Sequence, residues 1–328
     1  MSSILAVDVG GSGLRAQRVD DIGTGNSGTG SGSGSGGSRR SEHFESHGAA
    51  ITAGGIYLEP LLASVAEFAS RHRPRPDVVV WSMRGLLGLS DPEHVLRQVH
   101  SRLRGSRTVV TSDAVTSLVG ALGEVTPGAV LAAGSGVVAF ATDFADVWRM
   151  VDGWGHVLGD RGSGAWIGLE GLRAALATED GVPGGSTHLH EAALVAWGEP
   201  RTWPRAVMTT PDAQAKLAAF APAVASLAAE DPVAGQVVAR AAAHLADSLE
   251  SAASSIPGSS ATAVGGLMRI PELSAAFEDE VRRRGIHLTA ASGTALDGAL
   301  ALGRHVVLGR PLRARAPYLW CVGEGSWV

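Results

Sequence analysis

The chain has 328 residues, of which 45% are hydrophobic and 18% are charged, and its formal net charge is −5. This length is enough for about two domains of roughly 150 residues each. The composition excludes a disordered chain, and the net charge gives no electrostatic reason to expect nucleic acid or an anionic membrane as a partner. The single Cys321 excludes a disulfide framework and a cysteine-ligated cluster within one subunit.

Targeting signals are not evident in the sequence. It has no uninterrupted apolar run of about 18 residues, and Met1 leads directly into a strand-like segment without a basic leader. We therefore expect a cytoplasmic protein. Lys216 is the only lysine among the 27 basic residues, and it lies in an alanine-rich stretch without a glycine-rich loop before it. Because a P-loop needs a lysine beside its phosphate cradle, a Walker-type NTPase is excluded.

The first half of the chain alternates predicted strands and helices. Strands at 4–9 and 14–19 are joined by the glycine turn Gly10-Gly11-Ser12-Gly13. Residues 23–38 are almost entirely Gly, Ser and Thr, which predicts a flexible hairpin tip. The further elements expected are a helix at 60–73, a strand at 78–81, a helix at 95–103, a strand at 108–111 and a helix at 113–122. This alternation predicts an α/β fold.

The second half repeats the opening pattern. Strands at 129–133 and 137–142 are joined by Gly134-Ser135-Gly136. The elements expected after them are a helix at 166–177, a helical region at 213–249 broken near Asp231-Pro232, a strand at 261–264 ending in Gly265-Gly266, and helices at 272–284 and 295–303. We place the domain boundary just before the second glycine hairpin, which gives domains at 1–117 and 118–328.

The two glycine hairpins, about 120 residues apart, suggest a phosphate clamp. Glycine lets the backbone approach an anion closely enough for its N–H groups to bind it. Either turn by itself is more often an ordinary turn, but the pairing makes that interpretation weaker. Asp8 ends the first strand and could hold hydrated magnesium, and Ser135 adds a hydroxyl donor to the second turn.

Asp113 is the strongest catalytic candidate. It lies at the end of a predicted strand and the start of a predicted helix, on the side where open α/β sheets bind ligands. The alternative, which local sequence supports equally well, is that Asp113 caps the helix.

The densest signal lies at 152–168, where seventeen residues hold six glycines, two tryptophans and two aspartates. This composition predicts a shaped ligand loop, because tryptophan offers an apolar wall to a sugar ring and aspartate accepts hydrogen bonds from its hydroxyls. A structural loop that packs its own tryptophans is the alternative. His156 has an aspartate four residues to either side, for which hydrogen-bonded structure is favoured over metal ligation.

These motifs resemble those of the actin-like ATPase and sugar kinase superfamily. Asp8-Val9-Gly10-Gly11-Ser12 and Ala133-Gly134-Ser135-Gly136 resemble its two phosphate motifs, and Val264-Gly265-Gly266-Leu267 resembles its adenosine motif. The loop from Gly153 to Gly164 is similar to the signature of the N-acetylglucosamine kinase branch, which is grouped with the BadF/BadG/BcrA/BcrD ATPases. The motif order matches from residue 4 to about residue 303, which is nearly the whole chain.

The resemblance implies a two-lobed actin-like ATPase (ribonuclease H-like) fold with the active site in the cleft between the lobes. It implies an ATP-dependent and Mg2+-dependent kinase acting on an amino hexose at its 6-hydroxyl, with N-acetylglucosamine the leading candidate and glucosamine close behind. A homodimer is compatible with it. Its implied site residues are Asp113 as catalytic base, Asp8 for magnesium, Gly10, Gly11, Ser12, Gly134, Ser135 and Gly136 for the phosphates, Gly265 and Gly266 for adenosine, and Gly153, Trp154 and Asp160 for the sugar.

The sequence departs from the family pattern at four places. Ser12 replaces a threonine, and Arg161 replaces the glutamate of the usual Gly-Asp-Glu-Gly run. The segment 47–52 lacks the asparagine that usually binds the sugar, and the tract at 23–38 is longer than the usual turn. These departures bear on the identity of the sugar rather than on phosphoryl transfer.

Three rival functions make different demands on the sequence. An activator ATPase for a 2-hydroxyacyl-CoA dehydratase would need cluster-binding cysteines, whereas Cys321 lies outside every motif. A sugar-responsive repressor would need a DNA-binding segment before the first phosphate strand, where only residues 1–3 stand. An ATPase without sugar-kinase activity would hydrolyse ATP without stimulation by any sugar.

Overall fold

The computed structural model describes residues 2–10, 13–22, 41–49, 51–52, 55–71 and 74–323. Gly11, Ser12 and the tract at 23–38 therefore lie outside the described residues. The chain forms two compact units: unit 1 is Met1–Thr126 with Ala291–Val328, and unit 2 is Pro127–Ala290. The expected domains, 1–117 and 118–328, differ from this division because the chain returns to unit 1 after residue 290.

Unit 1 is built on a six-stranded mixed sheet in the order β12-β7-β6-β1-β2-β3. The strands are β1 (Ser2–Val9), β2 (Leu14–Ile22), β3 (Ser41–Ser46), β6 (Val78–Met83), β7 (Arg107–Ser112) and β12 (Leu319–Gly323). The central strands β1, β6 and β7 run parallel, so their carboxyl ends meet at one edge of the sheet. Every residue of β6 is buried, as expected for a strand covered on both faces.

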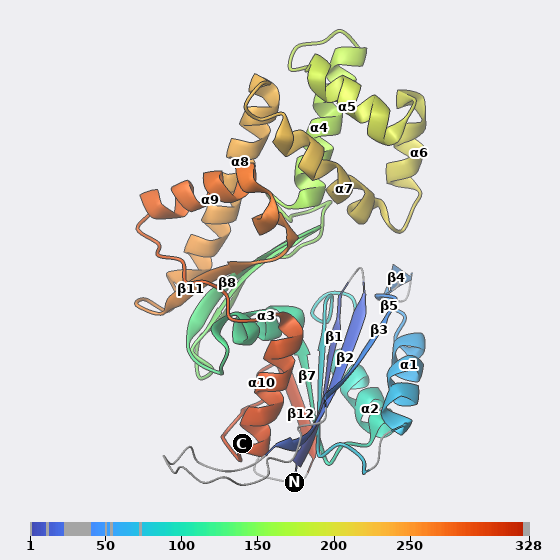
Figure 1. Ribbon diagram of the computed structural model, residues 1–328, viewed down its shortest axis with the longest axis vertical. Coiled ribbons are helices and arrows are strands. Elements are labelled where there is room, and N and C mark those ends of the chain that lie inside the picture. Colours follow the sequence, from blue (N-terminus) through green and yellow to red (C-terminus); the bar gives the residue numbers. More distant parts are fainter. Residues whose placement is uncertain are drawn as a thin grey trace, which may run out of the picture. The chain divides into compact units, whose positions relative to one another are not determined.

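Two pairs of helices cover the two faces of this sheet, as Figure 1 shows. The helices α1 (Glu59–Ser70) and α2 (Pro92–Leu103) share a core with one face of β1, β6 and β7. The helices α3 (Asp113–Leu122) and α10 (Ala295–Val307) lie on the other face.

The helices α3 and α10 cross with their backbones in close approach. A Cβ on Gly120 would lie 1.9 Å from the carbonyl oxygen of Thr294, and a Cβ on Gly298 would lie 1.9 Å from that of Thr116. Only glycine fits at both positions. The helix that begins at Asp113 is therefore held by a segment from the far end of the sequence.

Unit 2 contains a four-stranded sheet in the order β10-β9-β8-β11. Its strands are β8 (Gly128–Ala133), β9 (Val137–Thr142), β10 (Trp148–Asp152) and β11 (Ser260–Val264). Its helical segments are α4 (Gly164–Glu179), α5 (Thr187–Trp197), η1 (Pro200–Thr202), α6 (Trp203–Met208), α7 (Ala213–Ser226), α8 (Pro232–Ala253), η2 (Gly266–Arg269) and α9 (Pro271–Arg283).

The predicted break in the long helical region is confirmed, and its cause is local. The carboxylate of Asp231 accepts hydrogen bonds from the backbone N–H groups of Val233 and Ala234, and Pro232 occupies the first turn of α8. An Asp N-cap followed by proline starts a new helix rather than continuing the old one.

Several elements were not expected from the sequence. These are β3, β10, β12, α5, α6 and the small hairpin of β4 (Ile51–Thr52) and β5 (Gly55–Ile56). Most of these elements are short, and a short segment shows no clear hydrophobic period. The strand β3 shows none because it is a polar edge strand whose side chains are largely exposed. The α/β class itself is confirmed.

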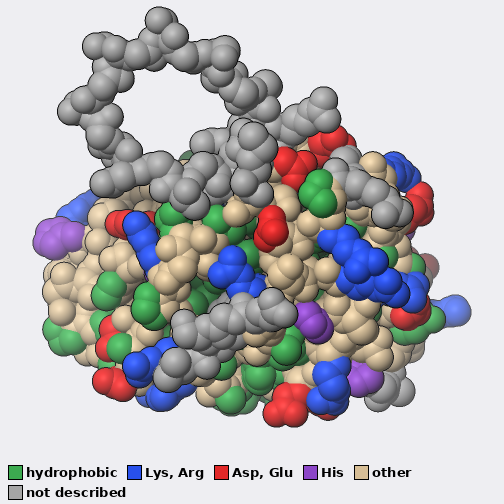
Figure 2. Space-filling view, turned by 90° about the horizontal axis from the view of Figure 1, so that it is seen from below, with side chains coloured by type: hydrophobic (Ala, Val, Ile, Leu, Met, Phe, Trp, Pro, Cys, Tyr) green, Lys and Arg blue, Asp and Glu red, His purple; other side chains and the backbone are tan. Residues whose placement is uncertain are grey.

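Basic and acidic side chains are interspersed on the face seen in Figure 2. Among the residues that the structure describes, no helix combines the length and apolar character needed to cross a membrane.

Candidate active site

The carboxyl end of β1 places Asp8 at the edge of the unit 1 sheet. Its register partners are Ser82 on the parallel strand β6 and Arg15 on the antiparallel strand β2. Ser82 donates a hydrogen bond from its Oγ to Asp8 Oδ1 at 3.3 Å. Ser82 Oγ also lies 2.6 Å from Thr116 Oγ1 on α3, so the strands and the helix are tied together beside Asp8.

Asp113 lies at the same edge, as the first residue of α3. The N-cap of this helix is Ser112, so the alternative interpretation of Asp113 as the cap is wrong. Asp113 is half-buried, and its desolvation raises the pKa of its carboxyl group, whereas the positive charge of Arg84 opposes that rise. Asp113 is therefore an acid-base group in an unusual environment at a strand end.

The two aspartates influence each other. Burial first, and then the neighbouring negative charge of Asp113, raise the pKa of Asp8 to about 6, against the hydrogen bond from Ser82 and the charge of Arg15. Two neighbouring carboxylates disfavour each other's ionisation, and a divalent cation would stabilise their ionised forms. Their oxygens are the hard ligands that such a cation prefers. Magnesium binding by Asp8 stays a prediction.

The first glycine turn is described only at its ends. Gly10 donates its N–H to the carbonyl oxygen of Gly13 at 2.8 Å, and its own carbonyl accepts a hydrogen bond from the N–H of Ala49 at 3.2 Å. The segment that lacks the expected asparagine therefore lies directly beside the first turn. Its residue Ala50 falls outside the described residues, as do Gly11 and Ser12.

The second glycine turn packs on the start of α4 in unit 2. Gly134 donates its N–H to the carbonyl oxygen of Gly136 at 2.8 Å. The carbonyls of Gly134 and Ser135 accept hydrogen bonds from the N–H groups of Gly164 at 2.9 Å and Ala165 at 3.2 Å. These bonds use two of the donors that a helix leaves unpaired at its N-terminus, and they fix the turn.

The loop after β10 is held by Asp152. Its carboxylate accepts hydrogen bonds from the backbone N–H groups of Asp160 at 2.6 Å and Arg161 at 3.0 Å. Asp152 and Asp160 both have positive φ, at 62° and 53°, so the loop turns sharply at each. Trp154 is 70% exposed, which leaves its indole ring available as a wall for a ligand.

Asp160 is buried beneath the second glycine turn. It accepts a hydrogen bond from Gln214 Nε2 at 2.9 Å. A Cβ on Gly136 would lie only 2.6 Å from Asp160 Oδ2 and 2.8 Å from Gln214 Nε2. The structure thus places the expected sugar ligand against the expected phosphate turn within unit 2, and sugar binding by Asp160 stays a prediction.

The expected adenosine motif also lies against the second glycine turn. Gly265 follows β11 with φ of 111°, and a Cβ there would lie 2.1 Å from the carbonyl oxygen of Ala133, the residue before Gly134. Gly266 has open space around it apart from the Arg269 side chain at 3.7 Å. Unit 2 therefore gathers Gly134, Asp160 and Gly265 into one region.

Several residues of this arrangement were not expected from the sequence. In unit 1 the hydroxyl of Ser82 bonds to Asp8 and lies within hydrogen-bond distance of Thr116, and the charge of Arg84 lowers the pKa of Asp113. In unit 2 Gln214 donates a hydrogen bond to Asp160. Ser82 and Arg84 could have been found, because they stand at the end of a predicted buried strand parallel to β1. Gln214 lies far from the loop in sequence and carries no such signal.

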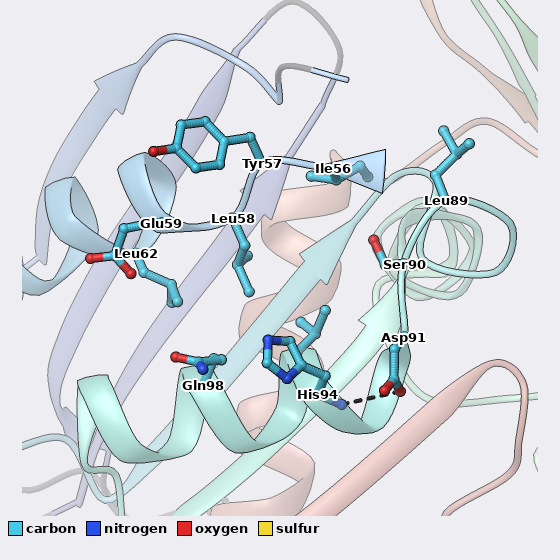
Figure 3. Close-up of a pocket in the computed structure, with 11 residues that line it drawn as sticks. Ile56, Tyr57, Leu58, Glu59, Leu62, Leu89, Ser90, Asp91, His94 and Gln98 are labelled. Carbon is cyan, nitrogen blue, oxygen red and sulfur yellow. Dashed lines mark hydrogen bonds between the residues drawn. The ribbon is translucent and has the colours of Figure 1, made fainter. Parts of the chain in front are cut away.

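The described residues include no group of three or more His, Cys, Asp or Glu side chains arranged to hold a metal ion. A cavity of about 370 Å³ lies between α1, α2 and the segments that precede them, as Figure 3 shows. Its walls include Leu58, Leu62 and Val95, with Ser90, His94 and Gln98 as polar members. The residues predicted for the site do not line this cavity.

The fold is that of the actin-like ATPases and sugar kinases. The chain belongs to the BadF/BadG/BcrA/BcrD ATPase family, which residues 45–297 match. The N-acetylmuramic acid/N-acetylglucosamine kinase of Clostridium acetobutylicum is 32% identical over 74 residues, which cover 23% of this chain. The match spans about a quarter (24%) of the length of that curated relative.

Solved structures share the fold over nearly the whole chain. A candidate N-acetylglucosamine kinase from Chromobacterium violaceum has a TM-score of 0.68 at 23% identity and covers 92% of this chain and 99% of its own. One from Porphyromonas gingivalis has a TM-score of 0.67 at 18% identity, covering 93% and 98%. A ROK family glucokinase from Streptomyces griseus, solved with glucose and AMPPNP, has a TM-score of 0.57 at 17% identity, covering 93% and 100%. The expected actin-like fold is confirmed.

Proposed function

We propose that the protein is an ATP-dependent sugar kinase that phosphorylates an amino hexose at its 6-hydroxyl, with N-acetylglucosamine the leading acceptor. The observation that carries the proposal is the pair of half-buried carboxylates, Asp8 and Asp113, at the carboxyl edge of the parallel strands in unit 1. Membership of an ATPase family and the names of the relatives support the use of ATP and a sugar.

Asp113 acts as the general base in this proposal. It accepts the proton of the sugar hydroxyl as that oxygen bonds to the γ-phosphorus of ATP, and the bond from that phosphorus to the β,γ-bridging oxygen breaks to release ADP. A base is useful only while ionised, and the positive charge of Arg84 opposes the rise in the pKa of Asp113 that burial causes.

Asp8 holds the magnesium ion in this proposal, which would neutralise charge on the phosphates during transfer. In this proposal Gly10, Gly11 and Ser12 of unit 1 bind phosphate, and so do Gly134, Ser135 and Gly136 of unit 2. Gly265 and Gly266 border the adenosine. Backbone N–H groups at such turns suit an anion because no side chain stands in the way.

Gly153, Trp154 and Asp160 bind the sugar in this proposal. The exposed Trp154 supplies the apolar wall, and Asp160 supplies a carboxylate that is already oriented by Gln214. The segment at 47–49 offers no side-chain amide beside Gly10. We therefore expect weaker discrimination between acetylated and free amino sugars than an amide would provide, since buried polar contacts give the strongest discrimination.

The test is a coupled ADP-release assay with N-acetylglucosamine, N-acetylmuramic acid, glucosamine and glucose at fixed ATP and magnesium, with the sugar phosphates identified by mass spectrometry. We expect the highest kcat/KM for an amino hexose and a product phosphorylated at oxygen 6. ATP hydrolysis that none of these sugars stimulates would contradict the kinase proposal and favour an ATPase without sugar chemistry.

The cluster-dependent activator is disfavoured by the environment of the only cysteine. Cys321 lies on β12 opposite Val109 of β7, and burial raises the pKa of its thiol to about 12. A thiol that resists ionisation is a poor metal ligand, because the thiolate is the form that binds iron.

A further inference from the structure

The backbone of Asp160 is held at both of its polar groups. Its N–H donates to Asp152 Oδ1 at 2.6 Å, and its carbonyl oxygen accepts a hydrogen bond from the N–H of Ser163 at 3.0 Å. Its φ of 53° lies in the left-handed region, which aspartate adopts more readily than most residues but at a conformational cost. Such a backbone persists only where its surroundings hold it. The loop therefore brings this carboxylate to one defined place.

The orientation of the carboxylate depends on a second element, because Gln214 Nε2 donates to Asp160 Oδ2 at 2.9 Å from the first turn of α7. An ionised carboxylate only accepts hydrogen bonds, so the amide nitrogen of Gln214 faces it. The last side-chain torsion of aspartate is otherwise broad. The hydrogen bond from Gln214 selects one orientation and makes the two carboxylate oxygens inequivalent.

The packing of α7 on α4 sets the position of the Gln214 amide. A Cβ on Gly168 would lie 1.9 Å from the carbonyl oxygen of Leu217, and one on Gly171 would lie 2.4 Å from Val224 Cγ2. The missing side chains of these glycines let the two helices approach closely. The helix α4 in turn begins at the hydrogen bonds that fix the second glycine turn. The donor therefore belongs to the rigid part of unit 2.

The second glycine turn covers the hydrogen bond. A Cβ on Gly136 would lie 2.6 Å from Asp160 Oδ2 and 2.8 Å from Gln214 Nε2. Asp160 is 3% exposed, so water has little access to replace a lost donor. A hydrogen bond to a charged group in such surroundings contributes more than one in water.

We propose that Gln214 is a positioning residue for sugar recognition, whose amide holds the Asp160 carboxylate in the orientation that accepts a hydrogen bond from a hydroxyl of the acceptor sugar. The inference rests on the proposed function, in which Asp160 is a sugar ligand. A site that binds a substrate hydroxyl through a fixed, buried polar group rejects an analogue without that hydroxyl, because the group then lacks its partner. Gln214 therefore contributes to specificity through Asp160.

The first test measures sugar binding to the full chain by titration calorimetry without ATP, using the four sugars of the coupled assay. Gln214→Met keeps the length of the side chain and removes the donor, and Gln214→Ala removes both. We expect each variant to raise the Kd of the tightest-binding sugar about 10-fold. Gln236→Met makes the same exchange at an exposed position of α8, and its Kd should stay within about twofold of the wild type. A normal Kd in Gln214→Met, with a loss only in Gln214→Ala, would assign the effect to bulk and overturn the proposal.

A second background separates positioning of Asp160 from other roles. Asp160→Asn removes the charge, and asparagine tolerates the left-handed backbone. If Gln214 acts through Asp160, Gln214→Met should raise the Kd in this background by no more than about threefold. A full 10-fold rise there would mean that Gln214 acts on the sugar by another route, which would contradict the proposal.

Kinetics add a readout that general support of the fold would not move. We expect Gln214→Met to raise the KM for the sugar about 10-fold, with kcat and the KM for ATP changed less than about threefold. An equal rise in the KM for ATP would assign Gln214 to the second glycine turn, through Gly136, and remove it from sugar recognition.

The last measurement compares the acceptor sugar with its 3-deoxy and 4-deoxy analogues. The wild type should reject at least one analogue by about 100-fold or more in kcat/KM, and Gln214→Met should lose about 10-fold of that discrimination. Equal discrimination in both proteins, or none in the wild type, would overturn the specificity role. If the wild type binds a sugar but transfers no phosphate to it, the proposed function fails, while calorimetry with the same sugar and its analogues still decides the role of Gln214. A wild type that binds none of the four sugars would overturn both.

Discussion

Ser82 and Asp8 are direct register partners on β6 and β1, and Ser82 Oγ lies 3.3 Å from the Asp8 carboxylate. The same hydroxyl lies 2.6 Å from Thr116 Oγ1, one turn into the helix that Asp113 begins. A short run of side-chain hydrogen bonds therefore connects the strand of one aspartate with the helix of the other. This connection ties β1 and β6 to α3 beside the two carboxyl groups.

The raised pKa of Asp8 predicts a pH-dependent gain of stability in Asp8→Asn. The folded state holds the Asp8 proton up to about pH 6, whereas the ordinary value is 3.8. The stability that this proton affinity confers is present at low pH and is lost as the pH rises through about 6. In EDTA, the melting temperature of Asp8→Asn minus that of the wild type should therefore increase between pH 4 and pH 7. A difference that stays constant over this range would contradict the shift.

Asp113→Asn should remove most turnover. A well-placed general base contributes about 10²-fold to 10⁴-fold, so kcat should fall within that range while the KM values for ATP and sugar change a few-fold. Because Ser112 is the N-cap, the substitution takes no cap from α3, and the fold should survive. The check is steady-state kinetics together with circular dichroism. Near-normal turnover in a folded variant would remove Asp113 from the catalytic role.

Gly136→Ala and Gly134→Ala form a matched pair in the second glycine turn. The new methyl group of Gly136→Ala would meet Asp160 and Gln214, whereas that of Gly134→Ala would meet nothing within 4 Å. Overpacking costs about 1–3 kcal/mol, so Gly136→Ala should lower the melting temperature by several degrees and raise the KM for the sugar. Gly134→Ala should melt within about a degree of the wild type. Equal melting temperatures for the two variants would show that Asp160 and Gln214 move aside freely.

Gly265→Ala and Gly266→Ala make the same comparison at the expected adenosine motif. Gly265 combines a φ of 111° with a backbone oxygen 2.1 Å from the position of a Cβ, whereas Gly266 has neither constraint. Backbone cannot move aside as a side chain can, so Gly265→Ala should be strongly destabilised or insoluble. Gly266→Ala should fold normally, and calorimetry of its nucleotide binding then reports on the motif without a folding defect. A stable Gly265→Ala protein would contradict the close packing of this turn on β8.

Local signals allowed prediction of the central elements from sequence. The helix at 113–122 and the strand at 137–142 were predicted residue for residue, because each has a polar or glycine boundary around a largely apolar segment. The position of Asp113 at a strand end followed from the same boundary.

Relationships between distant segments could not be predicted in this way. The return of α10 to unit 1 depends on Gly120 and Gly298, whose small size has meaning only when the two helices are packed together. Asp160 was expected to face a ligand, and its burial against Gln214 depends on the placement of α7, which periodicity alone does not determine. The influence of Arg84 was overlooked because an arginine after a strand is usually solvated, and Asp113, whose pKa its charge lowers, is 29 positions away in the chain.

The insertion of unit 2 between residues 126 and 291 of unit 1 has a consequence for biosynthesis. A ribosome delivers all of unit 2 before it delivers α10 and β12. Until then β7 lacks the strand that covers its outer edge, and α3 lacks the helix against which Gly120 packs. Unit 2 can therefore fold while unit 1 is still incomplete. A chain that ends between residues 126 and 291 would carry Asp113 on α3 without the support of α10.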